Sequence, residues 1–101
     1  MTTSVEDELA ALGKSFEQVD RELVRLLTER DRLTSEVAKI KWEAKLTIIR
    51  PNIEKQRLDA VYKWAQEMGH SNPDAIVLLF RLIINESCLV QVRSMEERMP
   101  K

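Results

Sequence analysis

An apolar stripe between Leu9 and Ala44 constrains the fold of this chain more than any other feature. Its members alternate in spacings of three and four residues, and they are Leu9, Leu12, Phe16, Val19, Leu23, Leu26, Arg30, Leu33, Val37, Ile40 and Ala44. This alternation, kept over about five heptads, predicts one long helix with a single apolar seam. Arg30 is the charged member of the seam, and a cation among apolar neighbours requires an anion.

The start of this helix can be placed at two positions. Ser4 is a good N-cap because the acidic residues 6–8 follow it in the first turn. Gly13 interrupts the stripe, and Ser15 offers a second possible cap. We expect the earlier start, at Val5, because the stripe keeps its phase on both sides of Gly13.

Two shorter helices are expected after the long one. Residues 45–50 break the period, and Pro51 suits the first turn of a new helix that runs to about Met68. Gly69 is a natural residue to follow a helix C-terminus, and Asn72-Pro73 is typical of an N-cap and the first residue of a third helix. The expected inner face of the middle helix comprises Ile53, Leu58, Val61, Ala65 and Met68.

The length of the first helix favours a second copy of the chain. At 1.5 Å per residue the helix is about 60 Å long, which exceeds the diameter of the small domain that 101 residues can form. An entwined all-α homodimer, with one long and two shorter helices from each chain, is the simplest way to bury the uncovered part of the seam. A long coiled-coil spacer is the alternative.

The composition and the absence of certain motifs exclude several classes of function. A net charge of −1 gives no bulk attraction to nucleic acid or to a membrane surface. The single cysteine, Cys88, rules out an intrachain disulfide and fits a reducing cytosol. The chain has no uninterrupted apolar run of membrane-spanning length, no signal-peptide pattern, no Cys/His metal spacing and no glycine-rich phosphate loop. We therefore expect a soluble, cytoplasmic protein without metal, membrane or nucleic-acid partners.

Four polar residues occupy positions on otherwise apolar helix faces. Lys41 lies about three turns after Arg30 and so shares its side of the long helix. Ser87 and Gln91 are one turn apart on the third helix. Either pair alone is commonly an ordinary polar edge or a snorkelling side chain. Together they predict a small polar pocket inside a helical bundle, suited to a compact anion with hydrogen-bonding groups.

Three stretches of the chain resemble a known family, the all-α (AroQ-type) chorismate mutases. Residues 19–30 look like the first-helix signature that ends in a substrate-binding arginine, and residues 37–41 look like the segment that ends in the catalytic lysine. Residues 79–91 are similar to the third-helix motif with its serine and glutamine. The resemblance spans residues 9–92 and implies one chorismate mutase-like helical domain over residues 1–101.

The resemblance also implies a reaction and the roles of four residues. The family forms an entwined homodimer and rearranges chorismate, a dicarboxylate, to prephenate in aromatic amino-acid biosynthesis, without a cofactor or metal. Arg30 would then pair with a substrate carboxylate, and Ser87 would contact a carboxylate or the ring hydroxyl. Lys41 and Gln91 would be the catalytic residues, donating hydrogen bonds to the ether oxygen as its C–O bond breaks.

The first helix departs from the family pattern at one position. The family normally has an arginine seven residues before the position of Asp20, and this arginine crosses to the partner's active site. Gly13 stands at that position here. The adjacent Lys14 points about 100° away on an ideal helix and could substitute for the arginine if the helix bends or restarts.

The start of the second helix departs as well. The family has an aspartate there and, three residues later, an Arg-Glu pair. Asn52, Lys55 and Gln56 are the closest match and are expected to bind substrate, with Gln56 at the ring hydroxyl. A shift of two places would instead put Glu54 in the glutamate position.

These departures leave related functions open. Isochorismate-pyruvate lyases and aminodeoxychorismate mutases share the fold and act on close analogues of chorismate. A non-catalytic helical dimer with a regulatory role is the alternative from another class. An enzyme is favoured over the non-catalytic dimer, because four hydrogen-bond donors are expected to face one pocket. Among the enzymes, chorismate mutase is the favoured function.

Overall fold

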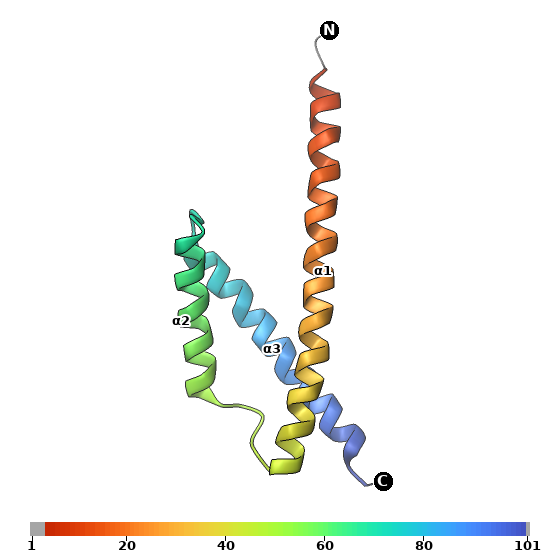
Figure 1. Cartoon of the computed structure of the whole chain (residues 1–101), viewed down its shortest axis with the longest axis vertical. Coiled ribbons are helices and arrows are strands. Elements are labelled where there is room, and N and C mark those ends of the chain that lie inside the picture. The colour runs from red at the N-terminus through yellow and green to blue at the C-terminus, as the bar shows by residue number, and fades with distance from the viewer. Residues whose placement is uncertain (1–3, 101) are drawn as a thin grey trace. The chain divides into compact units, whose positions relative to one another are not determined.

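The computed structural model describes residues 4–100, and the secondary structure of this part is three helices without strands (Figure 1). Helix α1 runs from Val5 to Ala44, α2 from Pro51 to Glu67 and α3 from Pro73 to Arg98. The prediction of an all-α chain with one long and two shorter helices is confirmed.

The first helix begins at the earlier of the two expected starts. The Oγ of Ser4 accepts a hydrogen bond of 3.1 Å from the backbone N–H of Asp7, which satisfies one of the free donors of the first turn. The helix continues through Gly13 without a break. The Oγ of Ser15 donates to the carbonyl of Ala11 at 3.4 Å, so Ser15 lies inside the helix and caps nothing.

The other helix ends also follow from local sequence. Pro51 occupies the first turn of α2, where its missing N–H costs no hydrogen bond. Gly69 follows α2 with a φ of 75°, a left-handed conformation that glycine adopts without strain. The Oδ1 of Asn72 caps α3 by accepting from the N–H of Ala75 at 3.2 Å.

The described chain divides into two compact units, of which one ends at Arg32 and the other begins at Leu33. The first unit is a single helix, the part of α1 up to Arg32. Ion pairs between residues one turn apart support its polar side, and they join Arg21 to Glu17, Arg25 to Glu22, and Arg32 to Glu29. Its large apolar side chains are 41–69% exposed, and they are Val5, Leu9, Leu12, Phe16, Val19, Leu23, Val24, Leu26 and Leu27.

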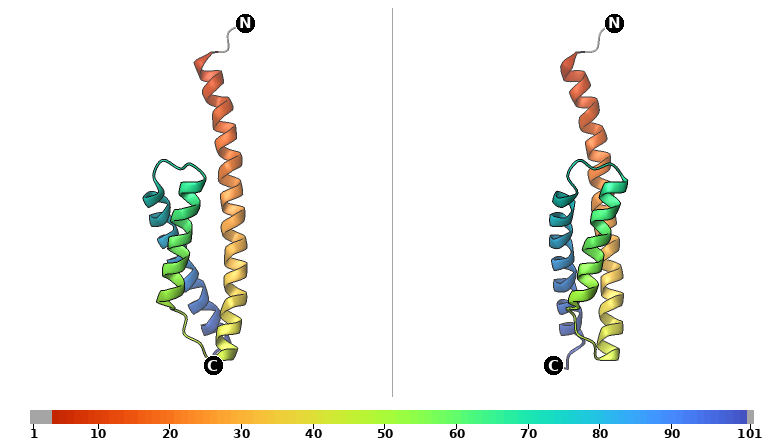
Figure 2. Two further views of the ribbon diagram at one scale, coloured as in Figure 1. Left: turned by 60° about the vertical axis from the view of Figure 1, so that its left-hand side comes forward. Right: turned by 90° about the vertical axis from the view of Figure 1, so that its left-hand side faces the viewer.

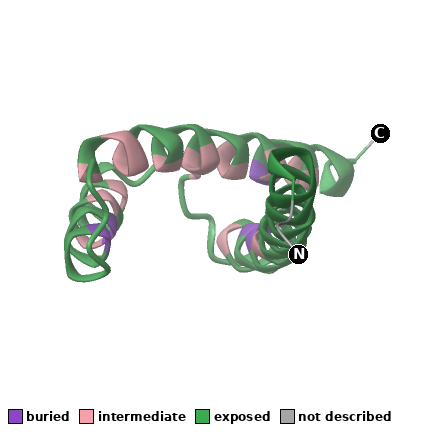
Figure 3. Ribbon diagram, turned by 90° about the horizontal axis from the view of Figure 1, so that it is seen from above, coloured by how far each residue is buried: buried purple, intermediate pink, exposed green. Residues whose placement is uncertain are grey.

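The second unit contains the end of α1, the loop at 45–50 and the helices α2 and α3. Helices α2 and α3 contact each other and run in opposite directions from a short turn (Figures 1 and 2). Its buried residues are Thr34, Ala38, Val61, Ala65 and Gln91. The buried and half-buried residues of α3 lie along one side of the helix (Figure 3).

Within the second unit, α1 presents two neighbouring stripes in different environments. Thr34 and Ala38 are buried and Lys41 is half-buried, at spacings of four and three residues that place them on one face. The seam residues beside them stay exposed, at 47% for Leu33, 41% for Val37 and 62% for Ile40. The single chain therefore leaves these seam residues largely uncovered.

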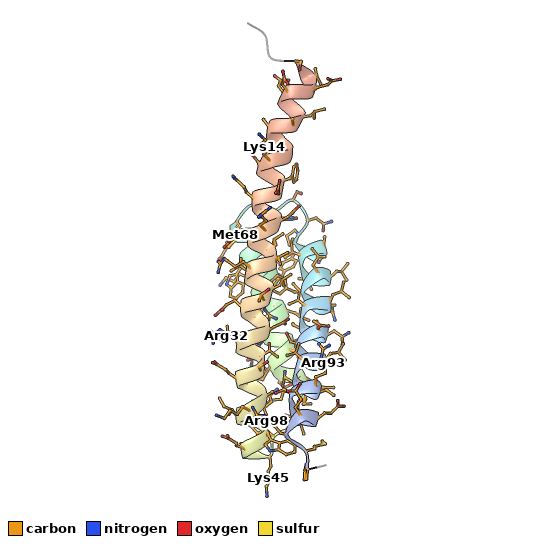
Figure 4. The ribbon with its side chains drawn as sticks, turned by 90° about the vertical axis from the view of Figure 1, so that its right-hand side faces the viewer. Lys14, Arg32, Lys45, Met68, Arg93 and Arg98 are labelled. Carbon is orange, nitrogen blue, oxygen red and sulfur yellow. The ribbon has the colours of Figure 1, made fainter. Side chains whose placement is uncertain are left out.

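Two further features of the apolar surface differ from expectation. Met68 was expected on the inner face of α2, but its side chain is 84% exposed because it caps the helix end (Figure 4).

Helix α3 is long and apolar enough to cross a membrane, with an 18-residue stretch of mean hydropathy 1.8 in spite of its charged residues. A helix that packs in a soluble helical bundle can have the same length and hydropathy, so this criterion does not separate the two.

Candidate active site

A hydrogen bond joins the ends of α1 and α3 at the polar residues that the sequence singled out. The Nζ of Lys41 donates to the Oε1 of Gln91 at 2.9 Å. Gln91 is only 7% exposed, and Lys41 is half-buried. Lys41 points inward because it continues the buried stripe of Thr34 and Ala38. The two residues are fifty positions apart, so this contact depends on the fold of the whole second unit.

The loop between α1 and α2 provides a second partner for Lys41. The carbonyl of Ile48 accepts from Nζ at 2.7 Å. The ammonium group has three N–H donors, and Gln91 and Ile48 accept from two of them. One donor therefore remains for a ligand, and the two fixed partners determine its direction.

The surroundings of Lys41 lower its pKa below the ordinary lysine value, chiefly through burial of the charge. The positive charges of Arg50 and Arg57 lower the pKa further. The negative charge of Glu54 and the Cys88 side chain act in the opposite direction. An anion placed here would gain from these cations and would raise the pKa of Lys41 again.

Gln91 is held by its acceptor oxygen, which leaves its NH₂ group free for a ligand. Among residues 4–100, no buried side-chain nitrogen or oxygen lacks a hydrogen-bond partner. The Nε2 of Gln91, to which the described residues offer no acceptor, therefore keeps some exposure to solvent although the residue as a whole is buried. Lys41 thus fixes the oxygen end of the amide, and the two N–H donors lie at its other end.

A second contact joins α2 to α3 beside this pair. The Sγ of Cys88 lies 3.7 Å from the Oε1 of Glu54, and both side chains are half-buried. The pKa of Cys88 is raised, first by burial and then by the negative charge of Glu54. Cys88 is therefore a neutral thiol that donates to the Glu54 carboxylate.

Ser87 lies on α3 one turn before Gln91 and is half-buried. Its Oγ donates to the carbonyl of Ile83 at 3.1 Å. Ser87, Gln91 and Cys88 occupy neighbouring positions along the side of α3 that carries its less exposed residues.

The remaining residues that the sequence predicted to bind substrate differ in their exposure. Asn52, Lys55 and Gln56 are exposed near the start of α2, where Lys55 lies 4.0 Å from Asp59. Arg30 belongs to the first unit and is half-buried. Lys14 is exposed on the N-terminal half of α1, and a side chain at Gly13 would meet no atom within 4 Å (Figure 4).

Sequence reasoning missed three groups around Lys41: the carbonyl of Ile48, the thiol of Cys88, and the cations Arg50, just before α2, and Arg57, on α2. Arg50, Glu54 and Arg57 are spaced by four and three residues, which is the signal that could have placed them on one helix face. The carbonyl of Ile48 carries no sequence signal, because every residue has a backbone oxygen.

The fold and the site define an all-α protein with a fixed set of hydrogen-bond donors, of a kind that binds and polarises a small anion. Residues 4–100 contain no group of three or more His, Cys, Asp and Glu side chains that could hold a metal ion. The chorismate mutase type II family matches residues 12–92, and the chain belongs to this family.

Two curated relatives are similar to the chain over most of its length. A chorismate mutase of Methanocaldococcus jannaschii is 28% identical over 96 residues, which cover 94% of this chain and 95% of that protein. A bifunctional chorismate mutase/prephenate dehydratase of Aquifex aeolicus is 33% identical over 85 residues, 82% of this chain. The match covers only 23% of the bifunctional protein. No solved structure gives a significant match to the chain.

Proposed function

We propose that this chain catalyses the rearrangement of chorismate to prephenate, as one mutase-like domain in the cytoplasm. The hydrogen bond between Lys41 and Gln91 is the observation that carries the proposal. It brings a half-buried cation and an amide together from two helices, in a chain that belongs to a chorismate mutase family. No cofactor is required, because the rearrangement breaks one C–O bond and forms one C–C bond within a single molecule.

The chemistry of the rearrangement matches what Lys41 and Gln91 offer. The ether oxygen of the substrate gains negative charge as its C–O bond breaks. The free N–H of Lys41 and the NH₂ of Gln91 would donate to this oxygen, and they stabilise it more in the transition state than in the ground state. Their fixed partners, described above, keep these donors in place, so they need little reorganisation during the reaction.

The two carboxylates of chorismate need cations around this pair. We propose Arg30 and Ser87 as carboxylate ligands, with Arg30 as the charged one. The neighbouring charges of Arg50 and Arg57, which lower the pKa of Lys41, add positive potential for the same dianion. Holding both carboxylates would also keep the enolpyruvyl arm over the ring, which is an orientation effect.

We propose Glu54 as the ligand of the ring hydroxyl. It is half-buried and lies against Cys88 on α3, whereas Gln56 is exposed. This arrangement supports the register shifted by two places at the start of α2. Asn52, Lys55 and Gln56 would then lie at the rim of the site, where they act on an approaching anion.

We propose that the working form is an entwined homodimer. The exposed apolar seam of the first unit and the exposed seam residues Leu33, Val37 and Ile40 require a cover, and a second α1 supplies a matching stripe. The apolar side of α3 would be buried in the same bundle and not in a membrane. The partner's first helix would also bring Lys14 toward the site, in place of the arginine that Gly13 replaces.

A comparison of three substrates tests the proposed function against its relatives. Purified protein is incubated with chorismate, isochorismate or aminodeoxychorismate, and the products are identified by NMR. Prephenate from chorismate, at the highest kcat/KM of the three, is the expected result. Pyruvate released from isochorismate would make the protein a lyase, and turnover of none of the three would support the non-catalytic dimer.

A further inference from the structure

The thiol of Cys88 contacts a carboxylate that the proposed reaction needs in a defined place. Cys88 on α3 and Glu54 on α2 are 34 positions apart, and their Sγ and Oε1 atoms are 3.7 Å apart. Both side chains are half-buried, so this contact is shielded from water on part of its surface. Among residues 4–100, Cys88 is the side chain that donates to Glu54.

The protonation states of the two groups determine which of them donates the hydrogen bond. Burial and the charge of Glu54 raise the pKa of Cys88, while Lys41 acts in the opposite direction. The thiol therefore stays protonated at neutral pH, and its S–H points toward the carboxylate. A thiol is a weak donor, so it orients Glu54 without neutralising it.

We infer that Cys88 is a positioning residue, whose thiol holds the Glu54 carboxylate beside Lys41 and Gln91. This inference rests on the proposed function, in which Glu54 accepts a hydrogen bond from the ring hydroxyl of the substrate. With Oε1 engaged by Cys88, the other oxygen of Glu54 is left to accept from the substrate.

The orientation of Glu54 is important because a carboxylate in this site has two opposite effects. It repels the carboxylates of a dianionic substrate, and it attracts a hydroxyl donor. A freely rotating glutamate would also lose rotamer entropy when substrate binds. Cys88 limits that loss and keeps the charge at the hydroxyl end of the site.

Three substitutions at Cys88 separate positioning from packing. Cys88→Ser retains a donor, Cys88→Ala removes it, and Cys88→Val fills the space without a donor. We expect Cys88→Ala and Cys88→Val to raise the KM for chorismate about threefold to fivefold, with a smaller change in kcat. Cys88→Ser is expected to stay within about twofold of the wild type.

A double-mutant cycle with Glu54→Gln shows whether Cys88 acts through Glu54. If it does, Cys88→Ala has little further effect on KM in the Glu54→Gln background. An equal rise in KM in both backgrounds would mean that Cys88 has a general packing role, and it would overturn the inference.

A titration of the thiol tests the contact without any turnover. Thiolate formation, followed by ultraviolet absorbance, should occur at a lower pH in Glu54→Gln than in the wild type, because a negative neighbour is lost. Cys88 is the single cysteine of the chain, so the signal is unambiguous. An unchanged thiol pKa would overturn the contact. A wild-type protein that does not turn over chorismate would overturn both the proposed function and the positioning role, while a lowered thiol pKa in Glu54→Gln would still support the contact.

Discussion

Lys41 and Gln91 hold each other in a defined orientation: the Nζ of the lysine donates to the Oε1 of the amide at 2.9 Å. Because the bond engages the oxygen end of the Gln91 amide, the NH₂ group is the end that faces away from Lys41. The carbonyl of Ile48 fixes the lysine from the loop side at 2.7 Å. Lys41 and Gln91 are thereby both held by contacts within the chain, and donors fixed in place before the reaction are what electrostatic catalysis requires.

We expect Gln91→Ala to lower kcat for chorismate by about a hundredfold or more, because one preorganised donor to the ether oxygen is lost. KM should change less, since the donor acts mainly in the transition state. Steady-state kinetics measure both constants. Gln66→Ala is a matched control, because Gln66 is an exposed glutamine of α2 whose loss should leave kcat unchanged. Equal kinetics in Gln91→Ala and the wild type would remove Gln91 from the mechanism.

The lowered pKa of Lys41 predicts an alkaline limit to activity below the pH expected for an ordinary lysine. The free enzyme loses its ammonium as the pH rises through this pKa, so kcat/KM falls there. The bound dianion raises the pKa, so the alkaline limb of kcat should lie at higher pH than that of kcat/KM. Profiles of both constants, measured between neutral and alkaline pH, check the separation. Superimposable limbs would contradict it.

The same shift affects stability with the opposite sign. The pKa of Lys41 is lower in the folded chain than in the unfolded chain, so the unfolded chain binds the proton more tightly between the two values. The Lys41 contribution to the free energy of unfolding therefore rises with pH in that window. Loss of activity at alkaline pH should accordingly precede any loss of helical circular dichroism.

Gly13 provides a test by gain of function. A side chain there meets no atom within 4 Å in the single chain, so the chain itself leaves room for one. Gly13→Ala should stabilise the helix by about 1 kcal/mol and leave kcat/KM unchanged. Gly13→Arg should raise kcat/KM at least about tenfold, if the arginine supplies a charge-assisted contact across the dimer. Activity of Gly13→Arg no higher than that of Gly13→Ala would show that the partner's helix does not contribute at this position.

The exposed seam predicts the oligomeric state. Sedimentation should give a mass twice the 11.8 kDa of one chain. Phe16→Asp places a charge in the seam at a residue that is 69% exposed in the single chain, and it should shift the protein toward monomers. Glu17→Gln, at an exposed neighbour off the seam, should remain dimeric. A wild-type mass of one chain would contradict the entwined arrangement.

Most of the fold could be predicted from short-range signals. Ser4, Pro51 and Asn72 each mark a helix start, because capping and proline effects depend on neighbours within a few residues. Met68 was misplaced because periodicity does not say where the last turn of a helix stops packing. The buried stripe of Thr34 and Ala38 was missed because small and polar residues contribute little to a hydrophobic pattern.

The site was predicted less completely than the fold, because its remaining contacts join distant parts of the chain. The carbonyl of Ile48 contacts Lys41 only after the loop at 45–50 has formed. The thiol of Cys88 contacts Glu54 only after the α2–α3 hairpin has formed. One sequence left two registers open at the start of α2. The contact of Glu54 with α3 depends on how α2 is rotated about its own axis. The pattern of charges in one sequence did not determine this rotation.

The most direct measurement compares wild-type protein and Lys41→Ala in the conversion of chorismate, with the product identified by NMR. The account predicts that the wild type forms prephenate, and that Lys41→Ala forms it at least about a hundredfold more slowly with its helical content and oligomeric state unchanged. Lys39→Ala, an exposed lysine two residues earlier on α1, should match the wild type. A folded wild-type protein that leaves chorismate unchanged, or a Lys41→Ala variant as fast as the wild type, would contradict the account.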